Sequence, residues 1–444
     1  MNLSRFLFIL SLLLCLTVRA QQELKSLSLE EAIAFGLENS YAAMGAAMDV
    51  DAAVKRKWEA TATGLPQISA RVDYQNFLKQ QVTLFDANGD GRDDEFTFGT
   101  KQNMQVFATL NQIIFDGSYL VGLQSAKTFL NISEQNKIKT DLEVRKDIIE
   151  AYSNALLTDE NIRILESNRA SLQKTLDETR AMFEAGLAEE ESVEQLQITQ
   201  LNIENSLNRS RRLKDVAYKL LNITLGIDLN TPLLLTDSLD NLVAQNLVES
   251  ISETPFQIGE NIDFQIAETN TRSQELLLKL EKSRALPTLN ASLNGGTTAN
   301  NDSFTFLSSG NGQRWFASSL FALNLQIPLF SSLERSAKTQ QARIALMQAQ
   351  TQQKEAEQRI RLAYESAKTD YEFSVETYQA NKQNLSLAER IERKNQVKFS
   401  EGVGSSFELA EAQRQLYTAQ QNYLQSIIDV INNKATLENI LNTK

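Results

Sequence analysis

Alternating apolar and polar residues mark four segments of the chain. In the first, residues 67–74, Ile68, Val72 and Tyr74 share one face and polar side chains occupy the other. A similar alternation follows residues 104–111 and 288–294 and, less regularly, 315–327. A period of two predicts β-strands, each of about the ten residues that a tilted strand needs to cross a bilayer. A half-buried sheet of a soluble protein has the same pattern, so the alternation alone leaves both open.

Long helices are predicted between and after these strands. No proline occurs in residues 67–231 or 329–444, and residues 118–182 contain a single glycine. About 65 helical residues at 1.5 Å each form a rod of roughly 100 Å. A seven-residue repeat, typical of left-handed coiled coils, links Leu142, Ile149 and Leu156 in one helix and Tyr364, Tyr371, Tyr378 and Leu385 in the other. We interpret the tyrosines as a packing seam rather than a ligand site.

The chain is predicted to be duplicated. Leu286-Pro287 repeats Leu65-Pro66, and residues 399–403 repeat residues 183–187, each separated from its counterpart by about 220 residues. Each half then holds a helix, two strands and a helical hairpin that reverses at a glycine. The expected division is a signal peptide (1–20), a first repeat (21–225), a connecting, equatorial segment (226–255) and a second repeat (256–444).

The first twenty residues predict a secretory signal. Arg5 precedes an apolar run, residues 6–16, and Val18-Arg19-Ala20 follows. Cleavage after Ala20 would remove Cys15, the only cysteine. Lipidation of Cys15 is the alternative, but it needs a small residue where Leu14 stands. An exported chain without disulfides is therefore expected.

Composition narrows the function. The 444 residues include no histidine, so there is no imidazole base and no His-ligated metal. With 44 basic and 56 acidic residues the net charge is −12, which disfavours nucleic-acid binding. No catalytic constellation is evident, and we predict that the protein is not an enzyme and has no cofactor.

Four strands cannot close into a barrel, and an open sheet edge is not tolerated in lipid. If the strands lie in a membrane, several chains must share them. Three chains would supply twelve strands and two chains eight, and both numbers are within the known range. The expected fold class is mixed α and β: a β-barrel continuous with a long α-helical coiled-coil tunnel.

Several motifs together resemble the TolC-type outer-membrane efflux family. They are Leu27-Ser28-Leu29-Glu30-Glu31-Ala32-Ile33, Gly64-Leu65-Pro66-Gln67, Phe98-Gly99-Thr100-Lys101 and the two Phe-x-x-Gly turns at 183 and 399. The resemblance implies a homotrimeric, twelve-stranded barrel in the outer membrane and a helical tunnel in the periplasm. It also implies a passive exit duct for tripartite efflux or type I secretion. A periplasmic adaptor joins such a duct to an inner-membrane pump of the RND, ABC or MFS type.

The resemblance also assigns residues. The adaptor-docking tip corresponds to Phe183, Gly186, Leu187, Phe399, Gly402 and Val403. Glu408 and Glu411 correspond to an acidic ring at the pore entrance, where three chains would gather six carboxylates. One departure is that the arginine and acidic residue of the family's closing latch correspond to Gly404 and Ser192, so that ion pair is not expected; Glu189-Glu190-Glu191 would add to the acidic entrance.

Two alternatives stay open from the sequence. A soluble periplasmic coiled-coil scaffold or chaperone would explain the export signal and the heptads, but not the strands. Separately, the loop between the first two strands follows part of the calcium-loop plan, with oxygen ligands at Asp86, Asn88, Asp90 and Asp94 and glycine at its sixth position. Thr97 stands where the final Glu is usual, and a plain hairpin turn explains the same residues.

Overall fold

The computed structural model describes residues 25–85, 89, 91, 94–248, 256–308 and 313–442. Contacts group the chain into two units. The first unit draws on Met1–Asp49, Glu134–Ala267 and Lys354–Lys444, and the second on Val50–Ser133 and Glu268–Gln353. Each unit thus contains parts of both sequence repeats, because each repeat contributes strands to one unit and a helix reversal to the other.

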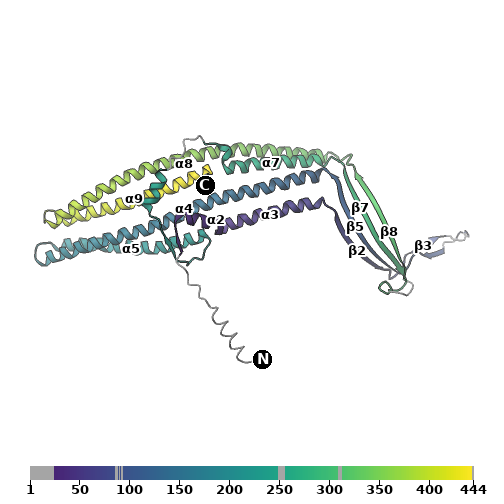
Figure 1. The fold of residues 1–444 in the computed structure, drawn as a ribbon, viewed down its shortest axis with the longest axis horizontal. Coiled ribbons are helices and arrows are strands. Elements are labelled where there is room, and N and C mark those ends of the chain that lie inside the picture. Colours follow the sequence, from purple (N-terminus) through teal and green to yellow (C-terminus); the bar gives the residue numbers. More distant parts are fainter. Residues whose placement is uncertain are drawn as a thin grey trace, which may run out of the picture. The chain divides into compact units, whose positions relative to one another are not determined.

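A four-stranded antiparallel sheet forms the centre of the second unit, in the order β2-β5-β7-β8 (Figure 1). Its strands are β2 (Gln67–Asn76), β5 (Gln102–Asp116), β7 (Thr288–Asn301) and β8 (Trp315–Gln326). The four predicted strands are confirmed. The two halves of the chain meet where β5 pairs with β7, from Gln102 opposite Asn301 to Asp116 opposite Thr288.

Two helices lead into the sheet, and a ribbon extends from it. Helix α3 (Tyr41–Thr63) precedes β2, and helix α7 (Ile262–Ser283) precedes β7. Strands β3 (Val82–Phe85) and β4 (Asp94–Thr97) form a separate antiparallel pair within the β2–β5 connection. The sequence pattern did not predict this ribbon.

Two long helices each reverse into a shorter one. Helix α4 (Gly117–Glu184) has 68 residues and α8 (Glu334–Ser400) has 67, which confirms the predicted lengths. They return as α5 (Glu190–Leu225) and α9 (Ser406–Leu441), each of 36 residues. The Asp116 side chain caps α4 directly after β5 by accepting a hydrogen bond from the Ser118 N–H (2.7 Å).

The remaining elements belong to the first unit. They are β1 (Lys25–Leu27), α2 (Leu29–Asn39), β6 (Leu233–Leu235), α6 (Leu239–Val248) and the 3₁₀ turn η1 (Ile258–Glu260). Strands β1 and β6 pair in parallel. Gly226 ends α5 with φ 78°, and a Cβ there would lie 2.1 Å from the Asn39 carbonyl oxygen, so only glycine fits.

The core of the first unit is apolar and contains one polar centre. Side chains of α4, α5, α6 and α9 form the apolar cluster, including Ile148, Leu221, Val243 and Ile431. Within it, the hydroxyl of the fully buried Tyr152 lies 2.9 Å from Asp237 Oδ2 and 3.0 Å from the Leu27 carbonyl oxygen. Burial, followed by the contact with Asp237, raises the pKa of Tyr152 above its ordinary value, so the phenol stays neutral.

The tyrosine stripe of α8 is a packing seam, as predicted. Its tyrosines do not all pack on a neighbouring long helix, as they would in a simple coiled coil. The Tyr364 ring stacks on Phe256, with centroids 4.5 Å apart, and the Tyr371 hydroxyl donates to the Asn246 carbonyl at 3.0 Å. Tyr378 stacks on Tyr423 of α9. Two of the three tyrosines therefore hold the segment around α6 against α8.

Candidate functional site

The first helix reversal, between α4 and α5, is a Schellman turn. The Leu187 N–H donates to the Met182 carbonyl (2.8 Å), and the Gly186 N–H donates to the Phe183 carbonyl (2.9 Å). Gly186 has φ +74°, a conformation that L-residues with a side chain rarely adopt. The predicted reversal is therefore confirmed, together with the physical reason for its glycine.

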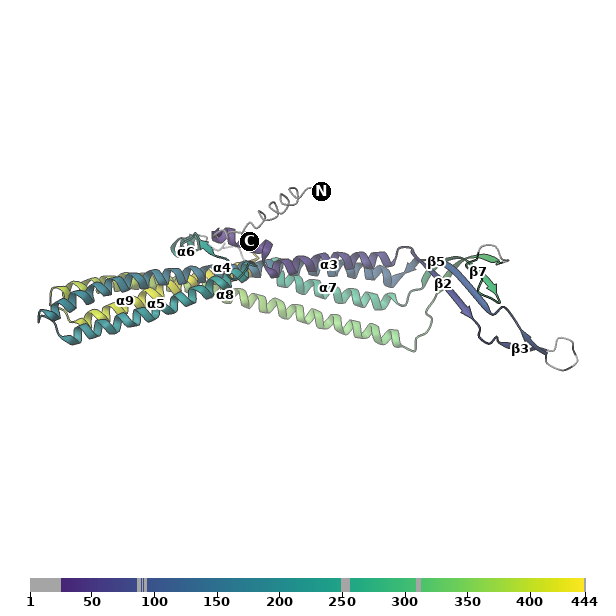
Figure 2. The same cartoon turned by 90° about the horizontal axis from the view of Figure 1, so that it is seen from below.

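The second reversal, between α8 and α9, repeats these bonds. The Val403 N–H donates to the Lys398 carbonyl (2.9 Å), and the Gly402 N–H donates to the Phe399 carbonyl (3.0 Å). Gly402 has φ +72°. Both reversals lie at the same end of the first unit, as the two views in Figures 1 and 2 show.

Large apolar side chains are exposed at both reversals. Leu187 is 80% exposed and Val403 77%, although in a Schellman turn this position often packs back onto the helix. Phe183 is 40% exposed and Phe399 is half-buried. Phe407, which the sequence analysis missed, is 70% exposed in the first turn of α9. The end of the first unit thus carries an apolar surface that these residues do not cover among themselves.

The two candidate pore carboxylates both have local partners. Glu408 is the third residue of α9 and completes a capping box: its carboxylate accepts from the Ser405 N–H (3.2 Å), while the Ser405 hydroxyl accepts from the Glu408 N–H. Glu411 accepts two hydrogen bonds from Arg414, at 2.7 and 2.9 Å. The Arg414 and Gln415 hydrogen bonds hold the pKa of Glu411 below its ordinary value. The pair therefore carries less uncompensated charge than two free carboxylates.

The latch positions lie in the same turns. Ser192 is in the first turn of α5, and its N–H donates to the Glu189 carbonyl at 3.1 Å. At Gly404, an added Cβ would come within 3.0 Å of the Lys398 side chain and 3.3 Å of the backbone carbonyl carbon of Lys398. The local turn therefore gives a steric reason for a small residue at 404.

Between the apolar cluster and the reversals, the two hairpins meet through polar side chains. The contacts are Asn168 Nδ2 to Gln420 Oε1 (2.9 Å), Gln421 Nε2 to Asn161 Oδ1 (2.8 Å) and Gln396 Nε2 to Thr175 Oγ1 (3.2 Å). The apolar cluster lies farther along the helices, around Ile148 and Ile431. The hairpins are thus joined by an apolar core at one end and, from there toward the reversals, by hydrogen bonds of amide side chains.

In the second unit, the two outer strands of the sheet each have one free edge. Among the described residues β2 pairs only with β5, and β8 pairs only with β7. Ile68 and Val72 of β2 are 75% and 61% exposed, and Phe321 and Leu323 of β8 are 64% and 61% exposed. The sheet therefore presents apolar side chains that no other part of the described chain buries.

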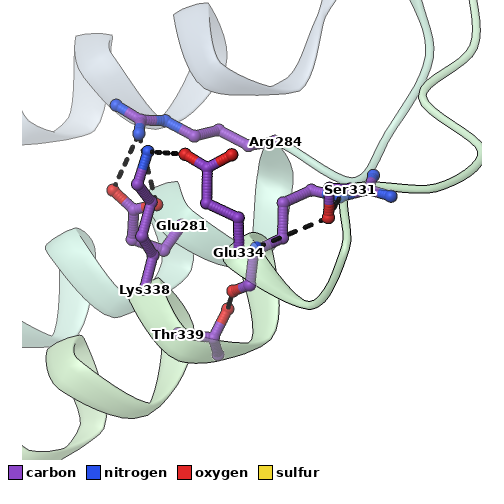
Figure 3. Close-up of polar contacts among 7 residues, drawn as sticks. Glu281, Arg284, Ser331, Glu334, Lys338 and Thr339 are labelled. Carbon is purple, nitrogen blue, oxygen red and sulfur yellow. Dashed lines mark hydrogen bonds and ion pairs between the residues drawn. The ribbon is translucent and has the colours of Figure 1, made fainter.

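A fixed loop joins β8 to α8. Ser332 and Leu333 have φ of 47° and 66°, which is strained for residues with side chains. Arg335 holds the loop: its Nε donates to Ser331 Oγ and its Nη1 to the Pro328 carbonyl, both at 3.0 Å. Figure 3 shows this turn beside two ion pairs, Glu334–Lys338 (2.6 Å) and Glu281–Arg284 (3.1 Å).

The calcium ligands lie outside what the structure describes. Asp86, Asn88 and Asp90 are not among the described residues, and the side chain of Asp94 is not described. Gly89 and Gly91, between them, have φ of 72° and 79°. Within the described residues no cluster of three or more metal-ligating side chains occurs. The calcium site stays a prediction.

The described chain thus combines two helical hairpins, which end in matched turns, with an open four-stranded antiparallel sheet. Among the described residues, no helix is both long and apolar enough to span a membrane. The family described as "Outer membrane efflux protein" matches residues 36–226 and 258–443, which is more than half of the chain. The chain belongs to this family. Its members are passive channels of the outer membrane, and the protein is accordingly an outer-membrane efflux channel protein and not an enzyme.

Similar proteins and solved structures are consistent with this family. The chain is 21% identical to the outer membrane protein TolC of Vibrio cholerae serotype O1 over 332 residues, 72% of either chain. The solved structure of CusC superimposes with a TM-score of 0.74 at 15% identity, covering 93% of this chain and 91% of CusC. The outer membrane protein VceC of Vibrio cholerae gives a TM-score of 0.72 at 14% identity, covering 93% of this chain and 96% of VceC. These structural likenesses establish the fold.

Proposed function

We propose that the protein is the passive outer-membrane exit duct of a tripartite efflux or type I secretion system. Three copies would pool their sheets into a twelve-stranded barrel, and their long helices would continue it as a tunnel in the periplasm. An inner-membrane pump of the RND, ABC or MFS type would supply the energy, and a periplasmic adaptor would connect pump and duct.

The open sheet is the observation that carries this proposal. Three successive antiparallel pairings make β2 and β8 run in opposite directions. Joining β8 of one copy to β2 of the next would therefore continue the antiparallel order around a closed ring, and all edges would be satisfied. Lipid would cover the exposed apolar side chains.

A soluble periplasmic scaffold or chaperone explains the sheet less well. In such a protein one face of the sheet would pack on a core, yet nine of the ten residues of β2 are exposed. Exposed apolar strands of this kind mark aggregation or assembly sites in soluble proteins.

The adaptor would dock at the two reversals. Leu187 and Val403 are exposed apolar residues on rigid Schellman turns, which suits insertion into a groove of a partner helix. The acidic entrance would include Glu408 and Glu411, but Arg414 offsets one of them. We therefore assign the larger share of its negative charge to Glu189, Glu190 and Glu191.

Cysteine cross-linking between neighbouring copies tests the barrel. Cys15 is the only cysteine, so a chain that loses its signal peptide has no background thiols. We would place one cysteine at Ala70 in β2 and one at Ser319 in β8, because the pairing register puts these two residues on the same face of the sheet. Oxidation in intact membranes should give covalent trimers that neither single-cysteine variant gives. Monomers that a salt or carbonate wash releases from the membrane would instead support the scaffold.

A further inference from the structure

A cavity of about 380 Å³ lies between the two helical hairpins of the first unit. Residues from α4, α5, α8 and α9 line it, so its walls belong to both hairpins. Its apolar wall consists of Leu172, Ile198, Ile203, Phe407, Leu416 and Tyr417. Sites for small molecules have volumes of about 300–1,000 Å³ and similar apolar linings.

The polar part of the lining is rich in unused acceptors. Glu392 lines the cavity and forms no hydrogen bond or ion pair with the described part of the chain. Gln413 Oε1 is buried without a hydrogen-bond partner among the described residues. The hydroxyl hydrogens of Thr199 and Ser206 are donated to backbone carbonyls of α5, which leaves their lone pairs available. These acceptors favour a ligand that supplies donors.

The cavity also has one negative charge, on Glu392, that forms no ion pair among the described residues. Arg414 is the only cation in the lining, and Glu411 neutralises it through two hydrogen bonds. Glu392 has no such hydrogen-bonded partner; its partial burial raises the pKa of its carboxyl group, against a smaller opposing effect of the charge on the adjacent Arg393. A positive charge placed beside Glu392 would therefore gain more than it would in bulk water.

We propose that this cavity binds an organic monocation, a primary ammonium group carried on an apolar body. The ammonium has three donors and no acceptor, which complements Glu392 and Gln413. Phe407 and Tyr417 offer aromatic surface to the apolar body, and aromatic faces also attract cations. A bound molecule would touch both hairpins where amide hydrogen bonds otherwise join them. This inference does not depend on the proposed duct function.

The test uses two fluorescent probes that differ in one charge. Dansylcadaverine carries a primary ammonium on an apolar aromatic body, and its N-acetyl derivative is neutral. Each would be titrated into the purified full-length protein in detergent, with protein-free micelles subtracted. We expect saturable binding of the ammonium probe and at least tenfold weaker binding of the neutral one. Glu392→Gln should weaken binding of the ammonium probe about tenfold, or 1.4 kcal/mol, and leave binding of the neutral probe unchanged.

Two further variants make the result decisive. Glu376→Gln removes the same charge from an exposed position of α8 and should bind both probes as the wild type does. Ser206→Trp should fill the cavity from α5 and abolish saturable binding, with circular dichroism and gel filtration unchanged. Equal affinity for the two probes, an equal effect of Glu376→Gln, or undiminished binding to Ser206→Trp would each overturn the proposal. So would the absence of saturable binding to the wild type.

Discussion

The two helical hairpins share one turn but differ in what surrounds it. Gly186 and Gly402 occupy the same place in matching Schellman turns. Near the first turn, Leu172, Leu176, Val193 and Leu196 form a small apolar core. The corresponding residues 216 positions later in the sequence are Ala388, Glu392, Leu409 and Ala412. The second hairpin therefore has a thinner core, with a carboxylate where the first has a buried leucine.

The returning helices begin differently as well. Ser405 and Glu408 form a capping box at the start of α9, whereas Glu189 precedes α5 without a side-chain cap. Glu190 and Glu191 then add charge to the first turn of α5, where the helix dipole favours carboxylates. The second hairpin engages Glu408 and Glu411 in a helix cap and an ion pair, and the first hairpin presents Glu189, Glu190 and Glu191 at the surface.

The two duplicated turns thus share the glycine that the backbone conformation requires, while the side chains around them differ. A glycine with positive φ cannot change without strain, so both copies keep it. Core and cap residues can change if another contact compensates. The divergence predicts that the hairpins respond alike to changes at the glycines and differently to changes elsewhere.

Substitution of the glycines should have the largest effect. Gly186→Val or Gly402→Val forces a β-branched residue to φ above +70°, which costs at least about 1–2 kcal/mol and deforms the proposed docking end. We expect either change to abolish transport in cells while heat-sensitive trimers persist on gels.

Asparagine provides the control, because it tolerates the left-handed conformation. Gly186→Asn and Gly402→Asn should retain most of the transport. Loss of the trimer in the valine variants would show that the glycines serve only the fold.

The second-largest effect is expected in the apolar core of the first hairpin, which is larger than the corresponding core of the second hairpin. Leu196→Ala removes a fully buried side chain and should cost about 2–5 kcal/mol in local stability. Ile198→Ala, two residues along at a 55% exposed position, should cost far less. Hydrogen exchange of the α5 amides measures both. Similar exchange rates in the two variants would contradict a packed core at this site.

The capping difference should produce an effect of about 1 kcal/mol. Ser405→Ala removes the side-chain acceptor from the α9 N-terminus and should speed exchange of its first-turn amides severalfold. Glu189→Ala removes no cap from α5 and should change exchange there less. A larger effect of Glu189→Ala would mean that the charge of Glu189 stabilises the start of α5 more than the Ser405 hydrogen bond stabilises the start of α9.

Much of the fold could be predicted from periodicity, because strands and long helices depend on local patterns. Alternation located β2, β5, β7 and β8, and the absence of proline located α4 and α8. The β3–β4 ribbon escaped prediction because its strands have four residues each, too few to show a period. The contacts between the α8 tyrosines and the segment around α6 are tertiary contacts, and no local sequence pattern predicts them.

The candidate site was predicted in position but not in detail. The glycine turns were recognisable from Phe-x-x-Gly, and the structure explains them by positive φ. Two local signals for Glu408 and Glu411 were present in the sequence: the Ser405-x-x-Glu408 capping box and Arg414 three residues after Glu411. The cavity between the hairpins needs residues from four helices and has no sequence signal.

Negative charge at the proposed pore entrance should come more from the first hairpin than from the second. Replacing Glu189, Glu190 and Glu191 by glutamine should lower cation selectivity in bilayer recordings more than the Glu408→Gln/Glu411→Gln pair does. The reason is that Arg414 already offsets Glu411, whereas no ion pair is formed by the three-residue run within the described chain. A larger effect of the Glu408→Gln/Glu411→Gln pair would instead support an acidic ring formed mainly by these two residues.

The smallest expected effect concerns Glu392, the carboxylate that replaces Leu176 in the second hairpin. Burial raises the pKa of its carboxyl group above the ordinary 4.5, so the folded chain binds this proton more tightly than the unfolded chain does. Stability from this group is complete below pH 4.5 and falls as the pH rises through the folded value. Glu392→Gln should therefore raise the Tm slightly at pH 7 and leave it unchanged near pH 4. Thermal unfolding at both pH values measures this, with Glu376→Gln as the exposed control. A variant that is equally or less stable than the wild type at pH 7 would show that Glu392 has a compensating partner in the assembled protein.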